Sequence, residues 1–74
     1  MREVTISQEP TELYKILKFE GLASSGGVAK HVIAEGEVLL NGKVETQKRK
    51  KIVAGDIIEF AGEKLHIQLQ QEND

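Results

Sequence analysis

The absence of cysteine from a chain of 74 residues is the feature that most limits what this sequence can form. A domain this short buries only about 60% of the surface of its unfolded chain, so its hydrophobic core is thin. Without cysteine, disulfides, thiolate zinc sites, iron–sulfur clusters and a cysteine nucleophile are all excluded. We therefore expect one domain over residues 1–74, in a reducing compartment and without a dinucleotide-binding crevice.

Charge divides the chain into three segments. The net charge is −2 for the whole chain, but it is −2 over residues 1–14, +4 over residues 15–51 and −4 over residues 52–74. The overall charge argues against a nonspecific polyanion binder. A basic segment between two acidic ones instead predicts a localised anion-binding face.

Local patterns in the first half predict a strand followed by two helices. Alternation at Val4 and Ile6 indicates a short strand. A helix is expected to begin within residues 9–12, where proline and acids are typical of a first turn, and to end at Gly21. A second helix is expected after a serine N-cap and before Gly36, in a helix-turn-helix-like arrangement, with the apolar stripe Val28, Ala29, Val32 and Ile33.

The second half reads as short strands joined by turns. Asn41-Gly42 between apolar residues predicts a hairpin, because both residues tolerate positive φ. Residues 46–53 are polar and then basic, which favours a loop. Strands are expected at residues 57–60 and 65–69, and the polar tail 70–74 is expected to fray.

Enzyme chemistry finds little support in the sequence, and no catalytic residue, metal ligand or cofactor is predicted. His31 and His66 are the only histidines, and neither has partners at the spacing of a metal site or a catalytic triad. Gly26 and Gly27 follow two serines and resemble a phosphate-cradling turn at a helix N-terminus. Because the P-loop spacing is absent, a phosphate of a nucleic-acid backbone suits this turn better than a nucleotide.

Basic residues of the middle segment carry the functional prediction. The run 48–51 consists of four cations, for which the alternative interpretation is a solvated loop. If the helices pack on a sheet, this run converges with four more cations: Lys15, Lys18, Lys30 and Lys43. The aromatic residues Tyr14, Phe19 and Phe60 fit core or boundary positions. Recognition of folded RNA by shape and backbone is therefore expected, rather than stacking on single-stranded bases.

Short motifs follow one another in a fixed order between Leu13 and Phe60. After an apolar helix they are Gly21–Ser25 (Gly-Leu-Ala-Ser-Ser), Ala29-Lys30, Ile33, Glu35–Val38, Leu40–Val44 and Gly55-Asp56. This series resembles the S4 domain, the RNA-binding module named after the fourth small-subunit ribosomal protein and also called the alpha-L motif. The small stand-alone bacterial members of that family are the nearest likeness.

The resemblance implies an α+β fold, with two packed helices against a small, bent, mostly antiparallel β-sheet that has an N-terminal strand. It also implies a non-catalytic protein that binds structured RNA, such as ribosomal or transfer RNA. With the basic residues above, the expected RNA-binding residues are Lys15, Lys18, Ser25, Lys30, His31, Asn41, Lys43, Lys48, Arg49, Lys50 and Lys51. Many family members carry arginine directly after the serine pair, where this chain has Gly26 and Gly27.

Two other functions are open at this point. A DNA-binding helix-turn-helix-like module is one, although its second helix offers only Lys30 and His31 to base edges. A protein-interaction adaptor that uses an exposed strand edge is the other. The expected setting is a cytoplasmic monomer with no membrane contact, since the N-terminus has no apolar signal core. The ribosome or another RNA-processing protein is the expected further partner.

Overall fold

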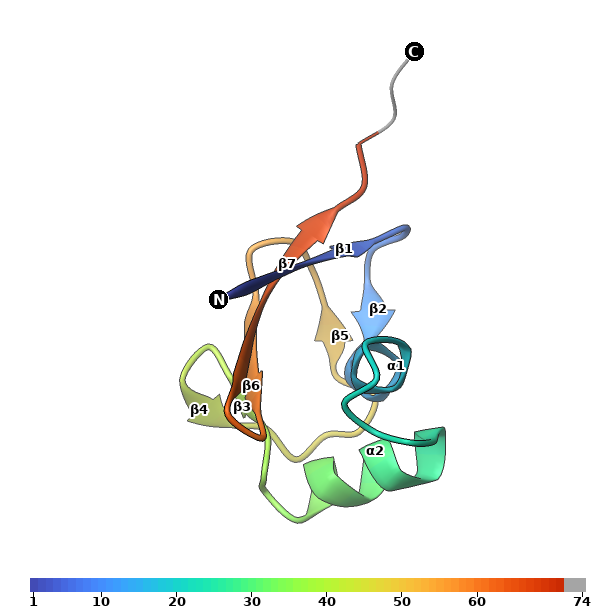
Figure 1. Cartoon of the computed structure of the whole chain (residues 1–74), viewed down its shortest axis with the longest axis vertical. Helices are drawn as coiled ribbons and strands as arrows, with labels where there is room; N and C mark the ends of the chain where they lie inside the picture. The colour runs from blue at the N-terminus through green and yellow to red at the C-terminus, as the bar shows by residue number, and fades with distance from the viewer. Residues whose placement is uncertain (72–74) are drawn as a thin grey trace.

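A small mixed sheet and two short helices form the fold (Figure 1). The computed structural model describes residues 1–71. The elements are β1 (Arg2–Ile6), β2 (Thr11–Glu12), α1 (Leu13–Phe19), α2 (Gly26–Ala34), β3 (Leu39–Leu40), β4 (Lys43–Val44), β5 (Lys51–Ile52), β6 (Ile57–Phe60) and β7 (Glu63–Leu69). Figure 1 shows both helices on the same side of the longer sheet. The predicted α+β class is confirmed.

The longer sheet has the strand order β1-β7-β6-β3-β4. The N-terminal strand β1 pairs in parallel with β7, and the other pairs of this sheet are antiparallel. Alternation in β1 and β7 places Val4, Ile6, Leu65 and Ile67 in the core, as expected for strands with one buried face. Strands β2 and β5 form a separate antiparallel pair.

Apolar residues spaced three and four apart attach the helices to the sheet. Leu13, Ile16 and Leu17 of α1 are buried, and so are Ala29 and Ile33 of α2. Ser25 caps α2 as predicted, because its hydroxyl accepts a hydrogen bond from the Val28 amide at 3.1 Å. One expectation is wrong: Val28, assigned to the apolar stripe, is 43% exposed, because Ala29 and Ile33, four residues apart, face the core and Val28 lies beside that row.

The predicted β3–β4 hairpin is confirmed, and its turn needs left-handed backbone at two positions. Asn41 has φ 52° and Gly42 has φ 84°. These are the conformations that a two-residue turn between twisted strands requires. The hairpin places Lys43 on the first residue of β4, directly opposite Leu40.

The predicted start of the first helix is wrong. Residues 9–12 are not helical: the Glu9–Pro10 peptide bond is cis, and Thr11 and Glu12 form β2. Glu12 keeps an extended backbone, with φ −70° and ψ 139°, and α1 begins one residue later. Pairing of β2 with the distant strand β5 outweighs the local helix signals.

The predicted loop over residues 46–53 is wrong in its second part. Lys51 and Ile52 form β5, which pairs antiparallel with β2. Ile52 is fully buried, so the end of the basic run is fixed to the core. Long-range pairing of this kind leaves no periodic signal in a two-residue segment.

Phe19 also departs from the prediction that all aromatic residues occupy core or boundary positions. It ends α1 and is 70% exposed, whereas Tyr14 and Phe60 are half-buried against the core. Phe19 is the last residue of α1, and its side chain lies outside the core that contains Ile16 and Leu17. It lines a groove with residues of β1, and among the other lining residues Lys15 is a cation and Glu20 an acid.

Of the tail predicted to fray, residues 72–74 lie outside the described residues. The Gln70 amide donates a 2.8 Å hydrogen bond to the Ile6 carbonyl, which continues the pairing of β7 with β1 by one residue. Within residues 1–71, neither helix has the length and apolar character needed to cross a membrane.

Candidate nucleic-acid interface

Three cations from different segments surround the ring of Tyr14. The Lys30 ammonium lies 4.6 Å from the ring centroid, the Arg49 guanidinium carbon 5.4 Å and the Lys15 ammonium 6.0 Å. We call these four residues the tyrosine cluster. The electron-rich face of an aromatic ring attracts cations, so Tyr14 offsets part of the repulsion among them. The cluster joins α1, α2 and the basic run at one place.

Backbone hydrogen bonds fix the basic run against the start of α1. The first amides of a helix lack partners within the helix. Here the Leu13 amide donates to the Lys50 carbonyl at 2.9 Å, and the Tyr14 amide donates to the Lys48 carbonyl at 3.1 Å. Arg49 lies between these two anchored residues, with its side chain exposed. The backbone of the basic run is therefore a turn docked on α1 and followed by β5, while the side chains of Lys48, Arg49 and Lys51 are exposed to solvent.

Glu12 adds a carboxylate to this group of cations. Its Oε1 lies 3.2 Å from the Lys15 ammonium, and its Oε2 lies 3.4 Å from the Arg49 guanidinium. The hydrogen bond from Lys15, with a further one from Arg49, lowers the pKa of Glu12 below its usual value of 4.5. The Glu12 carboxylate therefore keeps its charge to a lower pH than an isolated glutamate does.

Three further cations line a second basic site beside the hairpin. A hollow of about 650 Å³ lies between β3–β4 and the β5 segment, and Lys43, Lys50 and Lys51 line it. Glu45 and Asp56 also line this hollow, so its charge is mixed. We call it the hairpin hollow. The basic run contributes to both sites, with Arg49 at the tyrosine cluster and the two lysines that follow it at the hairpin hollow.

The structure does not bring every predicted residue into these two sites. Lys18 is exposed in the last turn of α1, His31 is exposed on α2, and the Lys48 side chain is exposed at the docked turn. The Ser25 hydroxyl already accepts the capping hydrogen bond from the Val28 amide. In place of the family arginine, Gly26 lies against Tyr14: a Cβ at Gly26 would be 3.7 Å from Cε2 of the ring.

The Asn41 side chain links the hairpin to the start of β6 through hydrogen bonds. Its amide nitrogen donates to the Asp56 carboxylate at 3.1 Å, and its amide oxygen accepts from the Ile57 backbone at 2.8 Å. The second Asp56 oxygen accepts from the Val53 amide at 3.0 Å. The Asn-Gly and Gly-Asp motifs are thus one hydrogen-bonded corner that positions the hairpin against β6.

Tyr14 and Glu12 are the residues that the sequence prediction missed. The sequence pattern places Tyr14 at the core or its boundary, and Glu12 at a helix start. Their partner Arg49 is far along the chain, and Lys30 lies on the other helix, so periodicity does not connect them. The one available signal was the local grouping of an acid, an aromatic residue and a base at positions 12, 14 and 15.

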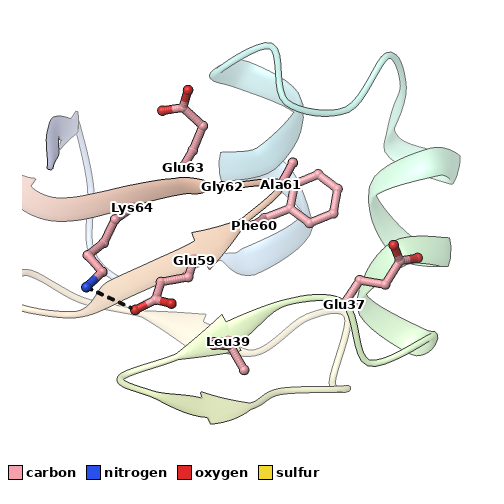
Figure 2. Close-up of a pocket in the computed structure, with 8 residues that line it drawn as sticks. All are labelled: Glu37, Leu39, Glu59, Phe60, Ala61, Gly62, Glu63 and Lys64. Carbon is pink, nitrogen blue, oxygen red and sulfur yellow. Dashed lines mark ion pairs between the residues drawn. The ribbon is translucent and has the colours of Figure 1, made fainter.

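An acidic surface is found where β6 turns into β7, in contrast to the two basic sites (Figure 2). Glu37, Glu59 and Glu63 line a hollow of about 290 Å³ there, and Lys64 pairs with Glu59 at 3.4 Å. His66 bonds to Glu3 at 2.9 Å on the pair of strands β1 and β7. Among residues 1–71, no group of three or more His, Asp or Glu side chains is arranged to hold a metal ion.

Comparison with known proteins places this geometry in a defined family. The S4 domain family matches residues 4–68. YbcJ of Escherichia coli strain K12 is 46% identical over 68 residues, covering 90% of this chain and 97% of YbcJ. A Bacillus subtilis protein named "Probable ribosome maturation protein RlbA" is 34% identical over 59 residues, covering 80% of this chain and 83% of its own length.

A solved structure is similar as well. The solution structure of YbcJ from E. coli superposes with a TM-score of 0.68, covering 90% of this chain and 86% of that chain. It is described as having an alphaL motif involved in RNA binding. The predicted resemblance, including the likeness to small bacterial members, is therefore confirmed.

Proposed function

The chain belongs to the S4 domain family, and from this premise we propose that it is a non-catalytic protein that binds structured RNA. YbcJ, its relative at 46% identity, is described as having a motif involved in RNA binding. The match to the S4 domain family covers residues 4–68, from within β1 to within β7. The tyrosine cluster is the observation in this molecule that carries the proposal. Cations from three segments held around one ring suit a phosphate backbone with a defined path.

The proposed RNA path runs from the tyrosine cluster to the hairpin hollow along the basic run. Lys15, Lys30 and Arg49 bind phosphates at one end, and Lys43, Lys50 and Lys51 bind them at the other. The exposed side chains of Lys18, Ser25, His31 and Lys48 contribute at the margins of this path. Asn41 supports the path by holding the hairpin corner.

Folded RNA suits this surface better than single strands or duplex DNA. Tyr14 is surrounded by cations and by Gly26, so little of its ring is free for base stacking. Helix α2 has nine residues and offers mainly Lys30 and His31, too few for reading base edges in a major groove. Recognition through backbone and shape remains, which is how proteins commonly recognise structured RNA.

We propose ribosomal RNA as the target, in the cytoplasm. The support is the relative RlbA, which is named for ribosome maturation. A protein without a catalytic centre would act in such a process by holding an RNA conformation. The two histidines lie on different elements: His66 is bonded to Glu3 on the strands, and His31 is exposed on α2.

Competition binding tests the proposal. A labelled ribosomal RNA fragment is bound to the protein, and unlabelled structured RNA, duplex DNA and single strands of equal length compete for it. Structured RNA is expected to compete best. Equal competition by duplex DNA would favour the DNA-binding alternative. Crosslinking in cells, followed by sequencing of the bound RNA, then identifies the target, and transfer RNA rather than ribosomal RNA would overturn the second proposal.

A further inference from the structure

The carboxylate of Glu12 bridges two of the cations that the proposed RNA path uses. Its two oxygens each face a different partner, Lys15 at 3.2 Å and Arg49 at 3.4 Å. The Arg49 side chain is 63% exposed and that of Glu12 only 28%. The arginine can therefore leave this pair for a ligand at the surface, while the carboxylate stays in place.

The backbone around Glu12 holds the carboxylate at this position. Glu12 pairs with Lys51 in the β2–β5 ladder, and the next two residues donate their amides to the carbonyls of the docked turn. The acid and its partner arginine are thus attached to the same rigid corner. Carboxylate and phosphate oxygens both accept charge-assisted hydrogen bonds from lysine and arginine, so the two anions are interchangeable partners for these cations.

We infer that Glu12 stands in for an RNA phosphate in the free protein, and that RNA binding exchanges this carboxylate for a phosphate at Arg49 and Lys15. The inference rests on the proposed function, which it deepens by naming a residue that limits affinity. In the free protein Glu12 keeps the two side chains ordered beside Tyr14. On binding, its negative charge remains next to the incoming phosphate and weakens the complex.

The exchange predicts an effect opposite in sign to that of most interface substitutions. In Glu12→Gln the side chain keeps its shape and can still accept a hydrogen bond, but it no longer competes through charge. RNA is expected to bind about two- to fivefold more tightly to this variant, as for removal of one nearby like charge at the surface. The salt dependence should steepen by about one ion, because no carboxylate is left to recapture a counterion.

Glu59→Gln is the matched control. Glu59 is also paired with a lysine, Lys64 at 3.4 Å, and its loss changes the net charge equally, but it lies at the acidic hollow of Figure 2. The affinities of wild type, Glu12→Gln and Glu59→Gln for one structured RNA are measured, with melting curves to establish that each is folded. Tighter binding by Glu12→Gln alone supports the exchange. Equal gains in both variants, or weaker binding by folded Glu12→Gln, would overturn it.

A double-variant cycle distinguishes competition between Glu12 and RNA for Arg49 from a general effect of the protein's net charge. Arg49→Ala should reduce RNA affinity more in the Glu12→Gln background than in wild type. In that background Arg49 has no ion pair with Glu12, so its full charge is available to the phosphate. Additive effects would contradict the exchange. If wild type fails to bind structured RNA, the proposed function fails. The inference is then tested on a heparin column, because heparin is a polyanion whose sulfate groups can replace the RNA phosphates. Glu12→Gln must elute from this column at a higher salt concentration than Glu59→Gln.

Discussion

At the scale of single residues, Lys30 is distinguished by its surroundings rather than by its type. It lies over the Tyr14 ring among other cations, whereas Lys64 is paired with Glu59 in the acidic third of the chain. Lys30→Ala should weaken RNA binding by roughly 1 kcal/mol and lower the salt slope by about one contact. Lys64→Ala should do neither. Equal affinities of the two folded variants, measured by titration with the same RNA, would contradict the proposed path.

Tyr14 makes a second residue-scale prediction, because the three cations lie within 6.0 Å of the centroid of its ring. Tyr14→Phe should keep RNA affinity, since the ring that faces Lys30 and Arg49 remains. Tyr14→Leu should reduce it by about 0.5–1 kcal/mol, which is the usual contribution of an exposed cation–π contact. Both variants are compared by RNA titration and by melting temperature. A loss in the phenylalanine variant equal to that in the leucine variant would show that the hydroxyl matters instead.

At this scale the sequence indicates which cations form the basic face, but it does not indicate the aromatic ring around which three of them lie. The charge of residues 15–51 predicts a basic face, and the structure places three of its cations around a ring assigned to the core boundary. A side chain's partners across two helices and a turn are a tertiary property. No spacing along the chain encodes the distance from Arg49 to Tyr14.

At the scale of elements, the junction of β2 and α1 makes the fold sensitive to acid. The hydrogen bonds from Lys15 and Arg49 lower the pKa of Glu12 in the folded protein, so they stabilise it fully above the unfolded value of 4.5. This contribution is lost as the pH falls through the lowered value. Between about pH 5 and about pH 3, the melting temperature of wild type should fall more than that of Glu12→Gln. Parallel melting temperatures across this range would contradict the role of Glu12.

The corner between the hairpin and β6 gives an element-scale prediction of a different kind. Asn41→Ala removes two hydrogen bonds, to Asp56 and from Ile57, and should destabilise the fold by about 1–2 kcal/mol. RNA affinity of the folded protein should stay near that of wild type. Lys43→Ala, in the same hairpin, should show the reverse pattern. Thermal melts and RNA titrations of both variants measure the two effects, and a strong loss of affinity in folded Asn41→Ala would return this residue to the interface.

Elements with a strong local signal were predictable, and those made by distant pairing were not. Asn41-Gly42 encodes its own turn, and Ser25 and Gly36 mark the two ends of α2. By contrast, β2 and β5 have two residues each and exist only because they pair. That pairing moves the start of α1 past Glu12, and it makes Lys51 and Ile52, two of the eight residues of the expected loop 46–53, part of a strand.

At the scale of the whole molecule, a chain with net negative charge presents a basic surface because the fold separates its charges. The tyrosine cluster and the hairpin hollow collect six cations of the middle segment. Glu37, Glu59 and Glu63 line the hollow at the turn between β6 and β7 (Figure 2). The charges of the three chain segments predict that basic and acidic residues separate along the sequence. The division of the basic run between two sites depends on the docked turn, which the sequence does not show.

This separation predicts how binding responds to salt. If about four to seven cations contact phosphates, the logarithm of affinity should fall with the logarithm of salt by about 0.7–0.9 per contact. A fourfold rise in salt should then weaken binding by roughly 50-fold to several thousand-fold. Titrations of one structured RNA at several salt concentrations measure the slope. Arg49→Ala and Lys51→Ala, from the two sites, should each lower it by about one contact, and Lys64→Ala should leave it unchanged. A flat slope in wild type would contradict a phosphate-binding face, because an acidic chain has no other source of attraction for RNA at long range.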